Sequence, residues 1–212
     1  MFKVVNASDT SRAIAFELWK NAPMPMVSFT KTLDVTRLVR LSRQQGLKFN
    51  MLMCWCICKA ASGIKEFYLL PANGGLLQYD SLAVNVIVAN KNGGINNCDI
   101  PFDDDFEKFA KDYSSLTECA SNDCRDIIDE SRNIIGTSAM TATELDSITN
   151  MWSGKYANPM LLWGKYRRNF FNVTLPVSLQ FHHVHMDGAE AAQFLENLQA
   201  EINRLKVWRQ GI

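Results

Sequence analysis

Hydrophobic and polar positions along the chain follow two periods, one typical of strands and one of helices. Alternation and β-branched content predict strands at 26–33, 81–90, 134–140, 160–166 and 172–183. Helical spacing and helix-start signals predict helices from Ser8 to before Pro23, and at 34–45, 50–62, 101–116 and 189–205. No Pro/Gly/Ser-rich linker, repeat or low-complexity segment divides them. We therefore expect a single domain over 1–212, an α/β fold with a mixed β-sheet sandwich and flanking helices.

Local signals predict where several helices begin, end and face. Ser8 and Asp34 are candidate N-caps, and Gly46 stands where glycine is favoured after a helix end. The segment 50–62 is apolar on nearly every side, so it should be a buried helix. An apolar stripe in the last helix indicates core packing and no cofactor site; its members are Ala192, Leu195, Leu198 and Ile202.

The balance of charges narrows the classes of partner. Of 212 residues, 22 are Lys or Arg and 22 are Asp or Glu, so the formal net charge is zero. Nucleic-acid binding rests on an excess of basic residues, so nucleic acid is not the expected partner. No stretch reaches the roughly 18 apolar residues of a membrane span, and the first ten residues do not resemble a secretory signal. The expectation is a cytoplasmic protein with reduced thiols and no membrane partner.

Three of the six cysteines, Cys54, Cys56 and Cys58, alternate within one apolar run. A zinc site usually has more closely spaced ligands, and the chain has no Cys-x-x-Cys pair and no histidine near this run. Cysteine also packs as a small apolar residue. We therefore expect these thiols in the core and no bound metal.

All three histidines, His182, His183 and His185, precede Asp187 and Gly188 at a predicted strand-to-helix junction. One interpretation is of structural histidines in a loop or core. A second is a metal site, since His183, His185 and Asp187 could share one face of a strand, although no further histidine exists to complete it. A third is general base catalysis, because histidine titrates near neutral pH. The gathering of every histidine at one turn favours the third.

The spacing His183-x-x-x-Asp187-Gly188 resembles the His-x-x-x-Asp-Gly motif of coenzyme A-dependent acyltransferases. Two branches are similar: chloramphenicol acetyltransferases and the catalytic core of dihydrolipoamide acyltransferases. The His182-His183 pair resembles the first branch, whereas the tail DGAEAAQFL is more like the second. Chain length and further segments resemble the first branch in order and spacing; these segments are 12–39, 47–50, 137–140, 158–166 and 175–183. The resemblance to the chloramphenicol acetyltransferase family therefore covers nearly the whole chain.

The resemblance implies roles for four residues. His183 matches the catalytic histidine, which takes the proton from a substrate hydroxyl as it attacks the acetyl thioester. Ser138 matches the serine that donates to the oxyanion of the tetrahedral intermediate. Asp187 matches an aspartate that pairs with an arginine near the N-terminus and fixes the histidine loop. An ungapped alignment puts that arginine at Ser11, and a shift of one residue selects Arg12, for which a solvated helix-surface charge is the alternative.

The resemblance also implies a coenzyme A site. Lys48, Lys165 and Tyr166 match family positions that contribute to it, and cations with an aromatic face suit phosphates and an adenine. Arg167 and Arg168 add charge nearby.

The acceptor pocket departs from the family. Trp19, Pro25 and Val27 stand where the family has a tyrosine, a cysteine and a phenylalanine, and Leu162 replaces a threonine that helps order the site. Gly136 replaces an asparagine. The catalytic residues are thus kept while the acceptor pocket changes. The resemblance therefore supports acetyl transfer more strongly than it supports chloramphenicol as the acceptor.

Together these features predict an O-acetyltransferase that moves the acetyl group of acetyl-CoA directly to a chloramphenicol-like hydroxyl, an antibiotic-resistance activity. The alternatives are an acyltransferase with a different hydroxyl or thiol acceptor, and a non-catalytic coenzyme A-binding homologue. The family forms homotrimers with active sites at subunit boundaries, so the resemblance implies a homotrimer here.

Overall fold

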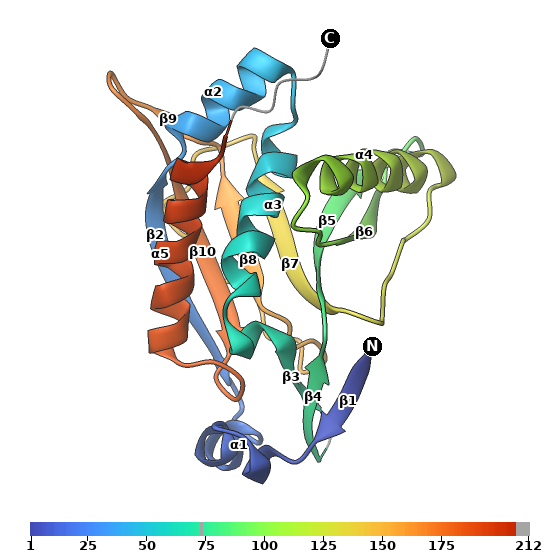
Figure 1. The fold of residues 1–212 in the computed structure, drawn as a ribbon, viewed down its shortest axis with the longest axis vertical. Helices are drawn as coiled ribbons and strands as arrows, with labels where there is room; N and C mark the ends of the chain where they lie inside the picture. Colours follow the sequence, from blue (N-terminus) through green and yellow to red (C-terminus); the bar gives the residue numbers. More distant parts are fainter. Residues whose placement is uncertain (73, 207–212) are drawn as a thin grey trace.

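A seven-stranded mixed sheet dominates the computed structural model, which describes residues 1–72 and 74–206 (Figure 1). Its hydrogen-bonded order is β2 (Met26–Asp34), β10 (Val173–His182), β8 (Met160–Gly164), β7 (Asn133–Met140), β5 (Leu82–Ala89) and β6 (Ile95–Pro101). The short β9 (Arg167–Arg168) pairs with β10. The central strands β5, β7 and β8 are parallel, and the other pairs are antiparallel. The mixed α/β prediction is confirmed.

Helices cover one face of this sheet: α2 (Thr36–Gln45), α3 (Phe49–Ser62), α4 (Phe106–Asp123) and α5 (Gly188–Arg204) (Figure 1). The central helix α3 packs against α2, α4 and α5 as well as the sheet, so almost all of its side chains are buried. Cys54, Cys56 and Cys58 are fully buried within it, and burial raises the pKa of the Cys54 thiol to about 12. These thiols therefore pack as neutral core groups.

Several helix ends follow the signals in the sequence. Gly46 ends α2 with a φ of +68°, a conformation that glycine adopts without strain. The Asp34 carboxylate accepts the N–H of Thr36, the first residue of α2, at 2.9 Å, although the N-cap position is held by Val35 and not by Asp34 as expected. The helix expected from 101 begins only at Phe106, because the Asp105 side chain caps it by accepting the N–H of Glu107 at 2.9 Å.

A second, smaller sheet lies at one end of the large one. It has the order β1 (Phe2–Val5), β4 (Gly75–Tyr79) and β3 (Leu69–Ala72). The short helix η2 (Lys65–Tyr68) precedes β3, and η1 (Ala7–Asp9) and α1 (Ala13–Trp19) follow β1. A satellite hydrophobic cluster joins these elements to the histidine turn; it consists of Ala7, Phe16, Leu69, Leu76 and Val184. The pattern of the sequence did not predict this sheet or β6.

Two local predictions are wrong. Ser8 is not a helix N-cap: it lies inside η1, where the Asn6 side chain accepts its N–H at 3.2 Å, and α1 starts only at Ala13. Ala192 is exposed and Ala191 is buried instead, because the buried stripe of α5 is shifted by one position there.

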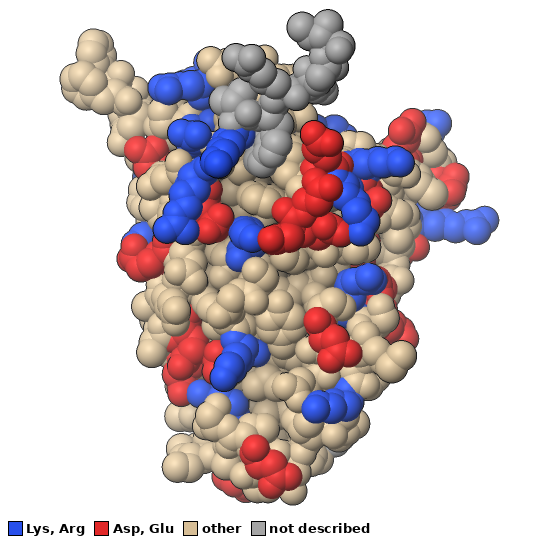
Figure 2. Space-filling model, viewed as in Figure 1, with Lys and Arg blue, Asp and Glu red and all other residues tan. Residues whose placement is uncertain are grey.

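The surface carries charges of both signs. On the face in Figure 2, basic and acidic side chains are interspersed and separated by uncharged surface. Among the described residues no helix is long and apolar enough to cross a membrane.

Candidate active site

The histidine segment joins the end of β10 to the start of α5. Phe181 packs in the main core, so His182, the last residue of β10, points to the opposite face of the sheet. His183 is the first residue beyond the strand, and its N–H donates to the Pro25 carbonyl at 2.8 Å. The chain then turns, with the His185 N–H donating to the His182 carbonyl at 3.2 Å. The backbone on both sides of His183 is therefore fixed.

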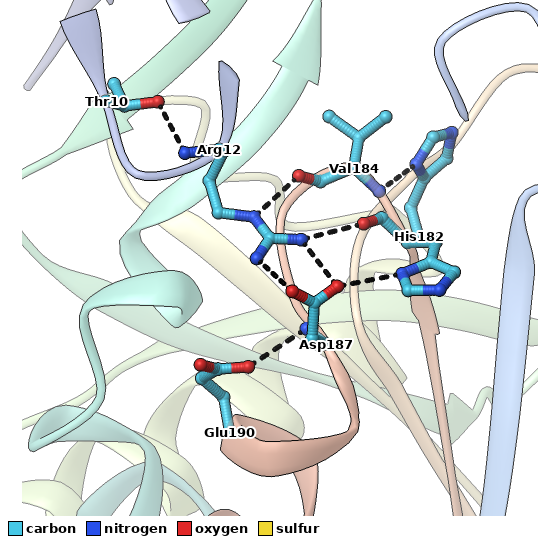
Figure 3. Close-up of polar contacts among 7 residues, drawn as sticks. Thr10, Arg12, His182, Val184, Asp187 and Glu190 are labelled. Carbon is cyan, nitrogen blue, oxygen red and sulfur yellow. Dashed lines mark hydrogen bonds and ion pairs between the residues drawn. The ribbon is translucent and has the colours of Figure 1, made fainter. Parts of the chain in front are cut away.

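Arg12 holds this turn from the other end of the chain (Figure 3). Its Nε donates to the Val184 carbonyl at 2.9 Å, and its Nη2 donates to the His183 carbonyl at 2.9 Å. Nη1 and Nη2 also donate to the two carboxylate oxygens of Asp187, at 2.6 and 2.9 Å. The Arg12 residue is only 4% exposed, and its hydrogen bonds lower the pKa of the Asp187 carboxyl. Arg12, not Ser11, thus makes the contact expected of the N-terminal arginine.

The imidazole of His183 lies between a carboxylate and an indole. Its Nδ1 is 3.0 Å from Asp187 Oδ1 without forming a hydrogen bond to it, and the two groups form an ion pair when the ring is protonated. The indole of Trp19 stacks on it, with ring centres 4.9 Å apart and planes 6° from parallel. Nδ1 is buried while 31% of the side chain is exposed, so the Nε2 edge is the accessible one. An accessible imidazole nitrogen backed by a carboxylate can accept a proton.

The other two histidines have different surroundings. His182 Nδ1 accepts the N–H of Val184 at 3.2 Å, and burial lowers its pKa to about 4. The ring of His185 is fully buried, with no hydrogen-bond partner for either nitrogen among the described residues, and burial lowers its pKa to about 3. Both rings are therefore neutral near pH 7. Within the described ranges no group of three or more His, Cys, Asp or Glu residues is placed to hold a metal ion.

One supporting residue was missed. Glu190, in the first turn of α5, accepts the N–H of Asp187 at 3.1 Å, which secures the residue that faces both Arg12 and His183. The sequence does contain a signal for it, since Asp187 and Glu190 have the spacing of a capping box.

Ser138 lies far from His183 within one chain. It faces Leu162 of β8, which faces Ser178 of β10, so these three residues form one row across the sheet. His183 is two strand spacings of about 4.8 Å to the side of Ser138 and five residues of about 3.3 Å further along. A single chain therefore does not bring the two predicted catalytic groups together.

Two of the residues expected at a coenzyme A site, Lys48 and Tyr166, lie at the start of α3. The ring of Tyr166 is 5.5 Å from that of Phe49, which directly follows Lys48. Arg168 lies over the Tyr166 ring at 5.1 Å and donates to its hydroxyl at 3.0 Å. Lys165 is exposed, and its N–H donates to a loop carbonyl. One cation, Arg168, thus lies on the Tyr166 ring, whereas the Lys48 ammonium lies over the Tyr113 ring, 6.0 Å from its centre.

The rest of that basic segment has other partners. Arg167 forms ion pairs with Glu144 at 3.5 Å and with Asp146 at 2.6 Å. Phe170 and Phe171 project from the tip of the following hairpin, almost fully exposed.

The four expected pocket residues fall into two groups. Trp19 stacks on the His183 ring, and the Pro25 carbonyl accepts the backbone N–H of His183, so both residues adjoin His183. Val27 pairs with Phe181 and packs against the main core, whereas Leu162 is beside Ser138.

The glycine at position 136 has a packing reason. A Cβ there would lie 2.9 Å from Met160 Cγ, so the Met160 side chain occupies the space that a side chain at 136 would need.

The fold and the clamped histidine turn fit the class of acyltransferases that the His motif resembles, and comparison with known proteins agrees. The model of the family described as chloramphenicol acetyltransferase matches residues 1–199. Chloramphenicol acetyltransferase 2 of Escherichia coli is 25% identical over 203 residues, which are 93% of this chain and 95% of that one. A chloramphenicol acetyltransferase of Clostridium perfringens is 25% identical over 98% of this chain and 97% of its own length. The chain belongs to the chloramphenicol acetyltransferase family, whose members are acyltransferases.

Solved structures show the same fold. A chloramphenicol acetyltransferase superposes with a TM-score of 0.81 at 19% identity, covering 95% of this chain and all of that one. A probable dihydrolipoamide acetyltransferase from Listeria monocytogenes superposes at 0.68 with 13% identity, covering 97% and 93% of the two chains. Of the two branches that the His motif resembles, the family model confirms the first.

Proposed function

We propose that this protein is an O-acetyltransferase that uses acetyl-CoA and an acceptor hydroxyl, with His183 as the general base. The observation that carries the proposal is the Arg12 clamp, which fixes the backbone of His183 and the carboxylate behind its ring. Such fixed orientation is what a base needs to meet a bound hydroxyl in a reactive geometry.

The proton moves through the accessible edge of the ring. His183 Nε2 takes the acceptor's hydroxyl proton as the oxygen attacks the thioester carbonyl carbon. Asp187, at 3.0 Å from Nδ1, stabilises the imidazolium that forms. When the tetrahedral intermediate collapses and the C–S bond breaks, His183 returns the proton to the leaving thiolate. The products are an acetyl ester and free coenzyme A, and no covalent enzyme intermediate forms.

Ser138 is the proposed donor to the oxyanion of that intermediate. Its distance from His183 in one chain means that a neighbouring chain has to supply it. We therefore propose that the protein works as a homotrimer in which each site combines His183 of one chain with Ser138 of the next. A closed ring of three head-to-tail contacts makes three equivalent sites.

Lys48, Lys165 and Tyr166 are the proposed contacts to coenzyme A. Lysines pair with phosphates as point charges, and the Tyr166 ring offers a face for the adenine. Arg168 already lies over this ring, so an adenine has to share that face or displace the guanidinium.

A hydroxylated small molecule of the chloramphenicol kind is the first acceptor to test. An acceptor of another shape is the specific alternative, because the residues adjoining His183 are Trp19 and Pro25, which change the pocket's shape and polarity.

The deciding experiment is a thiol-release assay with acetyl-CoA and a panel of hydroxyl and thiol acceptors that includes chloramphenicol. The wild type should release thiol with at least one acceptor, and His183→Ala should lower kcat by about 10²–10⁴-fold. Full activity in His183→Ala would contradict the mechanism. Acetyl-CoA binding in calorimetry without turnover on any acceptor would instead favour a non-catalytic homologue.

A further inference from the structure

A cavity of about 530 Å³ lies beside α1 and is lined by none of the predicted catalytic residues. Its α1 wall is formed by Ala13, Phe16, Glu17 and Lys20, positions spaced to lie on one stripe of the helix. Trp19, which stacks on His183, is not part of that wall. A cavity of this size suits a small organic ligand.

His182 presents a hydrogen-bond donor to this cavity. Its Nδ1 accepts the N–H of Val184 at 3.2 Å, so the neutral ring carries its proton on Nε2. His182 lines the cavity, and the residue as a whole is only 4% exposed. The indole of Trp152 packs edge-on against it, with ring centres 5.5 Å apart. Figure 3 shows the nitrogen not bonded to Val184 pointing away from the Arg12 cluster.

The charges of the cavity leave one cation unbalanced. Lys20 Nζ is paired with the Glu17 carboxylate at 2.7 Å, 5.4 Å from the centre of the Phe16 ring. Lys155 lies over the Tyr156 ring and makes no ion pair with any residue in 1–72 or 74–206. With His182 neutral, the lining carries a net charge of +1. Phe16 and Trp152 supply apolar wall.

We propose that this cavity binds a small organic anion with an apolar body, such as an aromatic carboxylate or phosphate monoester. The anionic group lies between Lys155 and His182 Nε2, and the apolar body lies against Phe16 and Trp152. Binding here would act on the backbone of Val184, whose N–H donates to His182 and whose carbonyl accepts from Arg12. The site is therefore placed to affect the turn that carries His183.

The test is calorimetry on the whole protein without acetyl-CoA, using benzoate and phenyl phosphate as probes and benzyl alcohol as the uncharged match. At least one of the two anions should bind with a stoichiometry of one per chain. Its affinity should be at least about tenfold higher than that of benzyl alcohol, because one charge-assisted hydrogen bond contributes about that factor. The stronger probe identifies the preferred anionic group. No binding of either anion by the wild type would overturn the proposal.

Three variants locate the binding. Lys155→Gln should weaken it about tenfold, and Ala13→Phe, which fills the cavity, should abolish it. Lys91→Gln, in the exposed turn between β5 and β6, is the matched control and should bind as the wild type does. Unchanged affinity in Lys155→Gln, or in an Ala13→Phe protein with native circular dichroism, would place the ligand elsewhere and refute the site. Because the readout is binding, the result does not depend on whether the protein transfers acetyl groups.

Discussion

The His183 turn and the Ser138 strand, the two halves of the proposed catalytic apparatus, are built in opposite ways. His183 is fixed within one chain by Arg12, Asp187 and the Pro25 carbonyl. Ser138 sits on a regular strand, and its hydroxyl bonds to none of the described residues. The difference teaches that the proposed base is preorganised by the fold of one chain, whereas the proposed oxyanion donor would reach the site only in the proposed trimer.

The largest expected effect on the stability of the His183 turn comes from replacing Arg12. Arg12→Met leaves the Asp187 carboxylate and two carbonyls without their donor, which should lower the free energy of unfolding by about 3–5 kcal/mol. Thermal or urea unfolding measures this loss of stability. Arg12→Lys should recover only part of the lost free energy, because a lysine ammonium cannot make all the hydrogen bonds of the planar guanidinium group. A decrease in unfolding free energy of less than about 1 kcal/mol would mean that the turn keeps its structure without Arg12.

Removing the proposed oxyanion donor should leave the unfolding free energy unchanged and lower kcat. Ser138→Ala should lower kcat by about 10²–10³-fold, with little change in unfolding free energy because the hydroxyl has no hydrogen-bond partner within 1–72 and 74–206. Steady-state kinetics and urea unfolding of the same sample measure both.

Mixing the two defective proteins tests whether the site is shared. If His183→Ala and Ser138→Ala chains are unfolded and refolded together, about a quarter of the sites should combine two intact residues, so activity should return. Each variant refolded alone is the control. Absence of recovery, with mixed oligomers shown to form, would put both groups in one chain.

Acid should destabilise the protein through its buried histidines. The native pKa values of His182 and His185 are about 4 and 3, below the ordinary 6.5, so the unfolded state binds more protons as pH falls below about 6.5. Stability should therefore be constant above pH 7 and decline from about 6.5 toward 4, by up to about 1.4 kcal/mol per pH unit per histidine. His185→Leu should remove about half of that slope, measured by urea unfolding across the range. An unchanged slope would show that the buried ring is protonated or solvated in solution.

Removing the cap should have the smallest effect. Glu190→Ala deprives the Asp187 N–H of its partner and should cost about 1 kcal/mol of unfolding free energy. Glu196→Ala, further along α5 with only a surface ion pair to Lys31, is the matched control and should change it by less. Equal effects would mean that the cap does not support the turn.

Much of the fold was predictable because its elements carry strong local signals. The alternation over β5 and β10, the apolar sequence of α3 and the glycine after α2 each specify local structure without distant contacts. The small sheet was not predicted, since its strands are only four or five residues long. The prediction of Ser8 as an N-cap was wrong because the Asn6 side chain, two residues earlier, accepts the N–H of Ser8 and caps the short helix there.

The site divides in the same way. The sequence by itself determined the chemical groups: one histidine segment, the Asp-Gly that follows it, and the serine and basic positions that resemble the family. Only the tertiary structure decided that Arg12 reaches the turn and that Trp19 lies on the His183 ring. It also decided that His185 is buried with no hydrogen-bond partner among the described residues, and that Ser138 lies far from His183. The physical reason is range: a pattern along the chain records local periodicity, whereas these relations join residues far apart in the sequence or depend on how the folded chain packs around a turn.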